Sequence, residues 1–138
     1  MKKFKFLEHT ADVKFQAFGK SLEEAFGNSA IALKQIMTKG IEKDVKGKIS
    51  KKIKITGDDL EGLLYNFLEE FLYLLDAENF LLSEIDCIKI KNNKLEAELS
   101  GDKARNYKFT NDVKAVTYNE MFVKHAKGKW IVQVVLDV

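Results

Sequence analysis

The sequence predicts an α+β protein in which two helices pack on a largely antiparallel, or mixed, sheet. Two observations support this fold class: segments with an apolar period of two lie near the start and throughout the last third, and two segments of helical period lie between them. The 138 residues, 46% hydrophobic and 32% charged, are typical of one globular domain. The chain has no proline and no Gly/Ser-rich linker, so we expect a single compact domain over residues 1–138.

The first part of the chain predicts two strands followed by a helix. The segments 4–7 and 13–18 are typical of strands, the second because it alternates apolar and polar side chains. Ser21 is placed to cap the N-terminus of the helix, with Glu24 three residues later as its capping-box partner. Apolar residues then recur at helical spacing up to the predicted stop at Gly40.

The middle of the chain predicts a half-exposed strand and a second helix. The stretch KGKISKKIKIT alternates isoleucine with lysine, which indicates a solvated edge strand, with contact to RNA phosphate as the weaker alternative. In GDDLEGLLYNFLEEFLYLLD, Asp58 is the predicted cap and Asp59 suits the positive helix end. The apolar face of this helix is too broad for a solvated helix, so we expect it to lie flat against the sheet. Its aromatic residues have core spacing: Tyr65, Phe67, Phe71 and Tyr73.

The last third predicts successive strands: residues 80–90, KLEAELS, DVKAVTYNEMFVKH and WIVQVVLDV. The turn residues Asn92, Asn93 and Gly128 indicate hairpins. The pattern leaves open whether KAVTYNEMFVKH is one long strand or a pair. The single cysteine, Cys87, lies in the apolar stretch IDCIKI, which favours a buried structural thiol.

The charge balance and the missing motifs exclude several function classes. A net charge of +2, from 23 basic and 21 acidic residues, lacks the overall basic footprint of a nucleic-acid-binding protein, although it leaves room for a local basic face. There is no GxGxxG, no P-loop and no glycine-bracketed serine or cysteine, so no catalytic residue is predicted. The N-terminus does not resemble a signal peptide and no apolar run is long enough to cross a bilayer, so we expect a cytoplasmic protein.

Three aspartates outside the helix surfaces are candidates for a site. Asp12 lies between two predicted strands, Asp112 is expected to start a strand, and Asp137 ends the last one. If the first turn meets the last strand, Asp12 and Asp137 form an oxygen-lined site for a hard cation; otherwise they are ordinary solvated aspartates. His9 is either a hydrogen-bonded structural residue or a ligand, and His125 is expected to be exposed.

Several segments, taken in order, resemble the archease family over essentially the whole chain: FLEHTADV, SLEEAF, a leucine-rich helix ending in LLD, DVKAVTY and WIVQVVLDV. The resemblance implies a protein cofactor of the RtcB-type tRNA-splicing RNA ligase rather than an enzyme. Such a cofactor promotes guanylylation of the ligase's active-site histidine, supports multiple turnover and widens nucleotide preference. The implied partners are this ligase and, through it, tRNA and GTP, with no membrane.

The resemblance also implies a metal site made of Asp12, Asp137 and an oxygen of Val138, holding a divalent metal ion. Calcium suits such an all-oxygen set. It further implies residues that support this site or contact the partner: His9, Asp112, Lys114, Thr117 and Tyr118. The chain departs from the family at Asn119, where the motif usually continues with histidine. Two other functions stay open: a general RNA- or protein-binding chaperone, and a metal-dependent phosphoesterase.

Overall fold

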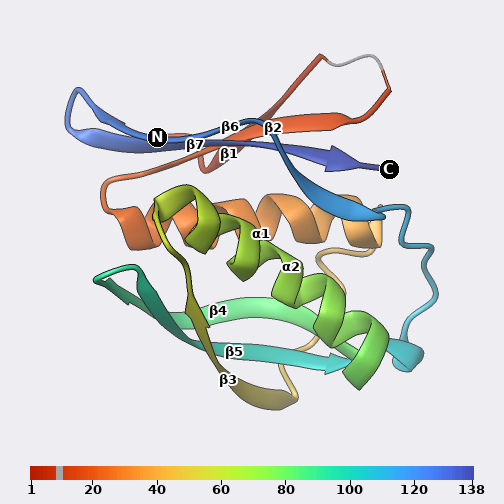
Figure 1. Cartoon of the computed structure of the whole chain (residues 1–138). Coiled ribbons are helices and arrows are strands. Elements are labelled where there is room, and N and C mark those ends of the chain that lie inside the picture. Colours follow the sequence, from red (N-terminus) through yellow and green to blue (C-terminus); the bar gives the residue numbers. More distant parts are fainter. Residues whose placement is uncertain (9–10) are drawn as a thin grey trace.

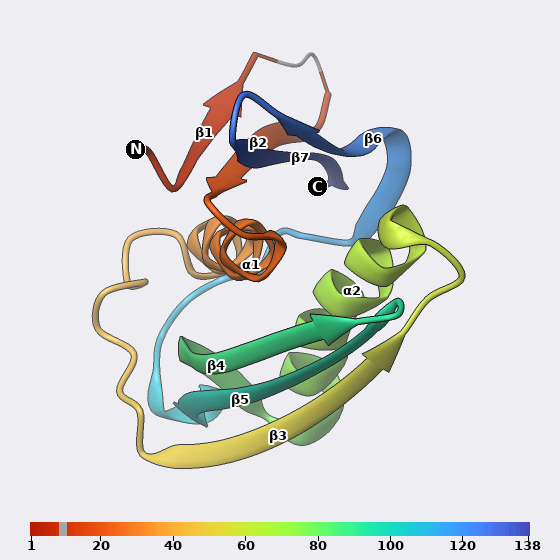
Figure 2. The ribbon, with the colours of Figure 1, turned by 90° about the vertical axis from the view of Figure 1, so that its left-hand side faces the viewer.

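In the computed structural model, which describes residues 1–8 and 11–138, two antiparallel sheets enclose a layer of two helices (Figures 1 and 2). Sheet A has the strand order β1-β2-β7-β6, with the bounds Phe4–Leu7, Val13–Gly19, Lys129–Asp137 and Ala115–Ala126. Sheet B has the order β3-β5-β4, with the bounds Ile49–Thr56, Lys94–Lys103 and Phe80–Lys91. The helices are α1, α2 and the short η1, with the bounds Leu22–Thr38, Leu60–Glu78 and Ala104–Asn106. The predicted α+β class is confirmed, and the strands are divided between two sheets instead of one.

The N-terminus of α1 forms half of the predicted capping box. The Ser21 hydroxyl accepts a hydrogen bond from the Glu24 N–H at 3.1 Å. The Glu24 carboxylate reaches back to the N–H of Lys20, at 3.3 Å, rather than to that of Ser21. The helix ends at Thr38, and Gly40 follows with a φ of +91°, as its role as a stop requires.

The cap of α2 is Asp59, so the prediction of Asp58 is wrong by one residue. The Asp59 carboxylate accepts a hydrogen bond from the Gly62 N–H at 2.7 Å, which satisfies one of the helix's first donors. The broad apolar face is explained by the position of α2 between the two sheets, which differs from the expected packing flat on one sheet (Figure 1). Phe67 is buried as predicted, whereas Tyr73 is 55% exposed and its expected core position is wrong.

An irregularity in β4 explains why the buried thiol predicted at Cys87 is wrong. Ile85 pairs with Leu99 and Cys87 pairs with Glu98, so Asp86 is one residue too many for the register. Such a bulge turns the following side chain to the other face of the strand. Cys87 therefore shares the exposed outer face of sheet B, and the apolar pattern around it gave no sign of this.

The strand β6 is one long strand with an irregular stretch, which resolves the alternative that the sequence left open. Thr117 and Phe122 are paired with β7, but the four residues between them, 118–121, face a single β7 residue, Val134. Glu120 lies in this stretch with a φ of 55°, in the left-handed region. The side chains of residues 118–121 are thus presented differently from those of a regular strand.

The predicted edge strand and hairpin turns are confirmed. β3 lies at the edge of sheet B, with Ile53 and Ile55 buried and the lysines between and beside them exposed. Positive φ angles at Asn92 and Asn93, 54° and 57°, give the β4–β5 turn the twist that a two-residue hairpin needs. Within the described residues, neither helix has both the length and the apolarity that crossing a membrane requires.

Candidate functional site

The two candidate metal-binding aspartates come together at one end of sheet A. β2 and β7 are antiparallel neighbours, and Val13 at the start of β2 pairs with Leu136 near the end of β7. Extending this register by one residue places Asp12 opposite Asp137. Opposite residues of an antiparallel pair have Cβ atoms about 5 Å apart, so both carboxylates can contact one ion. Asp12 is half-buried and Asp137 is exposed.

The third candidate ligand, Val138, lies beside the segment that leads into β6. Ala115 pairs with Asp137, and the Lys114 N–H donates a hydrogen bond to the Asp137 carbonyl oxygen at 2.8 Å. Asp112 forms an ion pair with Lys39, the residue that follows α1. A shallow hollow of about 430 Å³ lies between these elements, lined by Val13, Ile36, Lys39, Asn111, Asp112, Lys114 and Val138. The sheet end therefore joins a pair of carboxylates to a hollow that contains both charge signs.

The prediction that Asp112 starts a strand is wrong. The strand β6 begins three residues later, at Ala115. The Val113 N–H donates a hydrogen bond to the side-chain oxygen of Asn111 at 2.9 Å, a local bond in place of one to a neighbouring strand. Asp112 thereby stays exposed in an irregular segment, where its carboxylate reaches across to Lys39.

Thr117 and Tyr118 lie further along β6, at its irregular stretch. The Thr117 hydroxyl donates to the Val135 carbonyl at 2.9 Å and accepts from the Asn119 N–H at 3.3 Å. Tyr118 is 56% exposed, and its ring stacks on Tyr65 of α2 with centroids 4.3 Å apart and planes 5° from parallel. Thr117 therefore shapes the backbone, while Tyr118 presents an aromatic surface to solvent.

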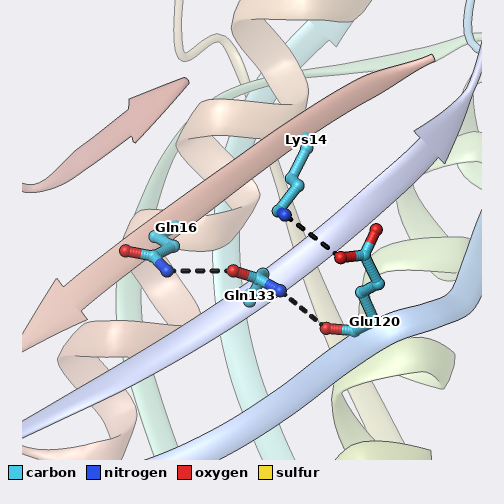
Figure 3. A network of polar contacts seen from close by, with 4 residues as sticks. All are labelled: Lys14, Gln16, Glu120 and Gln133. Atoms are coloured by element: carbon cyan, nitrogen blue, oxygen red, sulfur yellow. Dashed lines mark hydrogen bonds and ion pairs between the residues drawn. The ribbon is translucent and has the colours of Figure 1, made fainter. Parts of the chain in front are cut away.

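A polar network that was not predicted from the sequence joins the irregular stretch of β6 to β2 and β7 (Figure 3). The Lys14 ammonium pairs with the Glu120 carboxylate at 3.2 Å. The Gln16 amide donates to the Gln133 side-chain oxygen at 2.9 Å, and the Gln133 amide donates to the Glu120 carbonyl at 2.8 Å. The signal for it was a glutamine at the centre of each of two apolar strands, β2 and β7.

The donor chemistry at the sheet end fits a hard divalent cation. Two carboxylates and a main-chain oxygen are the ligand types that Ca²⁺ and Mg²⁺ prefer. Among the residues that the structure describes, no group of three or more His, Cys, Asp or Glu side chains could hold a metal ion. His9, the remaining candidate, lies outside the described residues. His125 is exposed, as predicted, with its ring 4.8 Å from that of Trp130.

The clearest buried charge belongs to the core and not to this site. Lys34 of α1 is 8% exposed, and its ammonium donates to the Ser83 carbonyl at 2.8 Å. Burial lowers the pKa of this lysine, while Glu42 and Glu84 act in the opposite direction. Ser83 is the extra residue where the β4 register shifts, so Lys34 satisfies a carbonyl that the ladder leaves out.

Two antiparallel sheets around two helices, with paired carboxylates where the central strands of one sheet end, define a small α+β protein with an oxygen-rich sheet end. The chain belongs to the archease protein family, whose model matches residues 4–138. An archease of Methanosarcina mazei is 36% identical over 99% of this chain and 97% of its own length. An archease of Pyrobaculum neutrophilum is 40% identical over 98% of this chain and 95% of its own.

Solved structures show the same fold. A solution structure of a Methanobacterium thermoautotrophicum protein has a TM-score of 0.81 and 31% identity, and the match covers 100% of both chains. A Thermotoga maritima protein described as an archease and possible chaperone has a TM-score of 0.61 at 18% identity, over 97% of this chain and 96% of that one. The predicted family membership is thus confirmed.

Proposed function

We propose that this protein activates the RtcB-type tRNA-splicing RNA ligase in the cytoplasm, by promoting guanylylation of the ligase's active-site histidine and so sustaining repeated turnover. The observation that supports this proposal is the antiparallel pairing of β2 with β7, in which Val13 lies opposite Leu136 and the next residues outward are Asp12 and Asp137. This agrees with the family's implied role for both aspartates. The protein itself then needs no nucleophile.

Asp12, Asp137 and the main-chain oxygen of Val138 are the proposed ligands of a divalent cation, most suitably calcium. A bound cation would supply positive charge next to nucleotide phosphates. Phosphoryl transfer depends mainly on positioning and charge neutralisation, so an accessory protein can accelerate it without a reacting group of its own. The role of this chain's residues is to hold that charge at an exposed sheet end.

Residues around the sheet end are the proposed contacts with the ligase. Asp112 and Lys114 line the hollow beside Val138 and are both exposed, so they are available to charged groups of a partner. Tyr118 offers a half-exposed ring already held by Tyr65, and aromatic residues of this kind often dominate the energy of an interface. Asn119 is exposed on the same stretch and retains an amide that can form hydrogen bonds.

The test is RNA ligation by the cognate ligase with substrate in large excess. The ligase alone should stop near one equivalent of product, and addition of this protein should let it continue. Asp12→Ala should abolish that stimulation while the protein stays folded by circular dichroism. Asp76→Ala, which removes an exposed carboxylate of α2, is the matched control and should stimulate like wild type. Full stimulation by folded Asp12→Ala protein would contradict the proposed role of the metal site.

A further inference from the structure

The outer face of sheet A is the face turned away from the helices, and no helix or strand of the described residues, 1–8 and 11–138, covers it (Figures 1 and 2). The register arranges its residues in rows across the strands. One end has the Asp12–Asp137 row, the middle has Gln16 paired with Gln133, and the other end has Phe18 paired with Ile131. The proposed metal site and the far end of the face therefore lie on one continuous surface.

The far end of this surface is basic. Five lysines from or beside the four strands gather there, and together they are called the basic face: Lys3, Lys5, Lys20, Lys124 and Lys129. Lys124 pairs with Ile131 in the same row as Phe18, and Lys5 pairs with Gln16 in the adjoining middle row. The Phe18 N–H donates to the Lys3 carbonyl at 2.9 Å, which brings Lys3 beside that row.

Aromatic rings hold the ammonium groups of the basic face near the sheet. The Lys5 and Lys129 ammonium groups lie 5.9 Å and 5.2 Å from the centroid of the same Phe18 ring. The Lys124 ammonium lies 4.4 Å from the centroid of Phe122. Cation–π attraction keeps these charges together despite their mutual repulsion, and an anion placed between them would relieve that repulsion.

Carboxylates of sheet A lie away from the basic face. Glu120 and Asp137 are the acidic residues of its four strands, and Glu120 bonds Lys14 toward the middle of the surface. On the outer face of sheet B, by contrast, Lys52 and Lys54 pair with Glu98 and Glu96 of the neighbouring strand. The lysines of the basic face are therefore suited to an external anion, as those of sheet B are not.

We propose that the basic face binds the phosphodiester backbone of single-stranded RNA, with the strand directed along the sheet toward Asp12 and Asp137. A chain of phosphates matches lysines contributed by successive strands, and electrostatic contact of this kind needs no base recognition. An anionic membrane fits less well, because Phe18 is only 8% exposed and membrane-surface binding needs protruding apolar groups. The choice of RNA over other phosphodiesters rests on the proposed function.

The experiment measures fluorescence anisotropy of a short labelled oligouridylate with the full chain and no ligase. If three phosphates are contacted, raising the salt concentration from about 50 to about 200 mM should weaken binding roughly 20-fold. The triple variant Lys5→Gln, Lys124→Gln and Lys129→Gln should lose roughly tenfold in affinity at low salt and show a flatter salt dependence. The matched control neutralises three exposed lysines of sheet B, namely Lys52, Lys54 and Lys89, and should change affinity less than about twofold.

Equal losses in the two triple variants, or no binding by wild type at low salt, would overturn the proposal. Binding to phosphatidylserine vesicles with no binding to oligouridylate would overturn it as well. Guanylylation of the ligase is measured separately, with wild-type protein and no RNA. RNA binding without stimulated guanylylation would count against the proposed function alone, and stimulated guanylylation without RNA binding would count against the basic face alone.

Discussion

Sheet A and sheet B are both antiparallel and both bury one face against the helices, yet their outer faces carry charge differently. Sheet B neutralises its own charge, because lysines of its edge strand β3 face glutamates of β5, as in the pair Lys52–Glu98. Sheet A separates its charges along the strands, with Asp12 and Asp137 at one end and the basic face at the other. A face that satisfies its own charges serves stability and solubility, whereas a face that separates them is suited to ligands of both signs.

The helix layer packs against both sheets, so we expect the whole chain to unfold as one cooperative unit. Removing a side chain from the centre of the helix layer should therefore cause the largest loss of stability. Phe67 of α2 is fully buried and packs on Phe26 of α1 with centroids 6.0 Å apart. Phe67→Ala should lower the free energy of unfolding by about 3–5 kcal/mol, since it leaves a cavity. Urea unfolding followed by circular dichroism checks this, with the exposed Tyr73→Ala as control. Two separate transitions would show that the sheets unfold independently.

Sheet B should contribute more than sheet A to the acid sensitivity of the whole fold, because a buried carboxylate, Asp102, ties its end to the following loop. Asp102 accepts hydrogen bonds from the Tyr107 hydroxyl at 2.7 Å and the Lys103 N–H at 2.8 Å. The bond from Tyr107, above all, lowers the pKa of the carboxyl below its ordinary value of 3.8. This carboxylate therefore stabilises the fold above that ordinary pKa, and its contribution is lost as pH falls through the lowered pKa.

Asp102→Asn should accordingly reduce stability at neutral pH and flatten the loss of stability in acid. The measurement is the urea midpoint at a series of pH values from neutral downward. Asp76→Asn, at an exposed position of α2, is the control and should keep the wild-type pH dependence. If the urea midpoint of Asp102→Asn fell in acid as steeply as that of wild type, Asp102 would not be the source of this acid sensitivity.

Sheet A has a different tie to the helix layer, the stack of Tyr118 on Tyr65. The rings are parallel within 5°. Burial and the neighbouring Glu69 raise the pKa of Tyr65, so its phenol stays neutral at physiological pH. Tyr118→Ala should cost about 0.5–1.5 kcal/mol of stability from the lost ring contact. A double-mutant cycle with Tyr65→Ala isolates the pair, and additive losses would mean that the stack does not hold β6 to α2.

The smallest effect is expected at the paired charges of sheet B. The Lys52 and Glu98 side chains are 83% and 56% exposed, so solvent screens their attraction across 3.6 Å. Lys52→Ala should change the free energy of unfolding by less than about 0.5 kcal/mol. Thermal unfolding at low and high salt checks this, and a loss above about 1 kcal/mol would make the neutralised face a major source of stability.

Local chemistry made much of the fold predictable. The Ser21 cap, the asparagine turn at residues 92–93 and the alternation of β3 depend on neighbouring residues alone, and the structure confirms each of them. The errors have non-local causes. A bulge exposes Cys87 although it lies in a largely apolar stretch, and Tyr73 falls on the solvent face of α2 although Leu72 and Leu74 beside it are buried.

The candidate site divides in the same way. Motifs such as HTADV and VVLDV were enough to identify the family and the candidate aspartates. That Asp12 and Asp137 lie at the same end of sheet A follows only from the fold, because the paired strands β2 and β7 come from opposite ends of the sequence. Only the order of four strands, moreover, gathers Lys5, Lys124 and Lys129 on one face. Charge placement in a sheet depends on register and strand order, and neither is a property of any single segment.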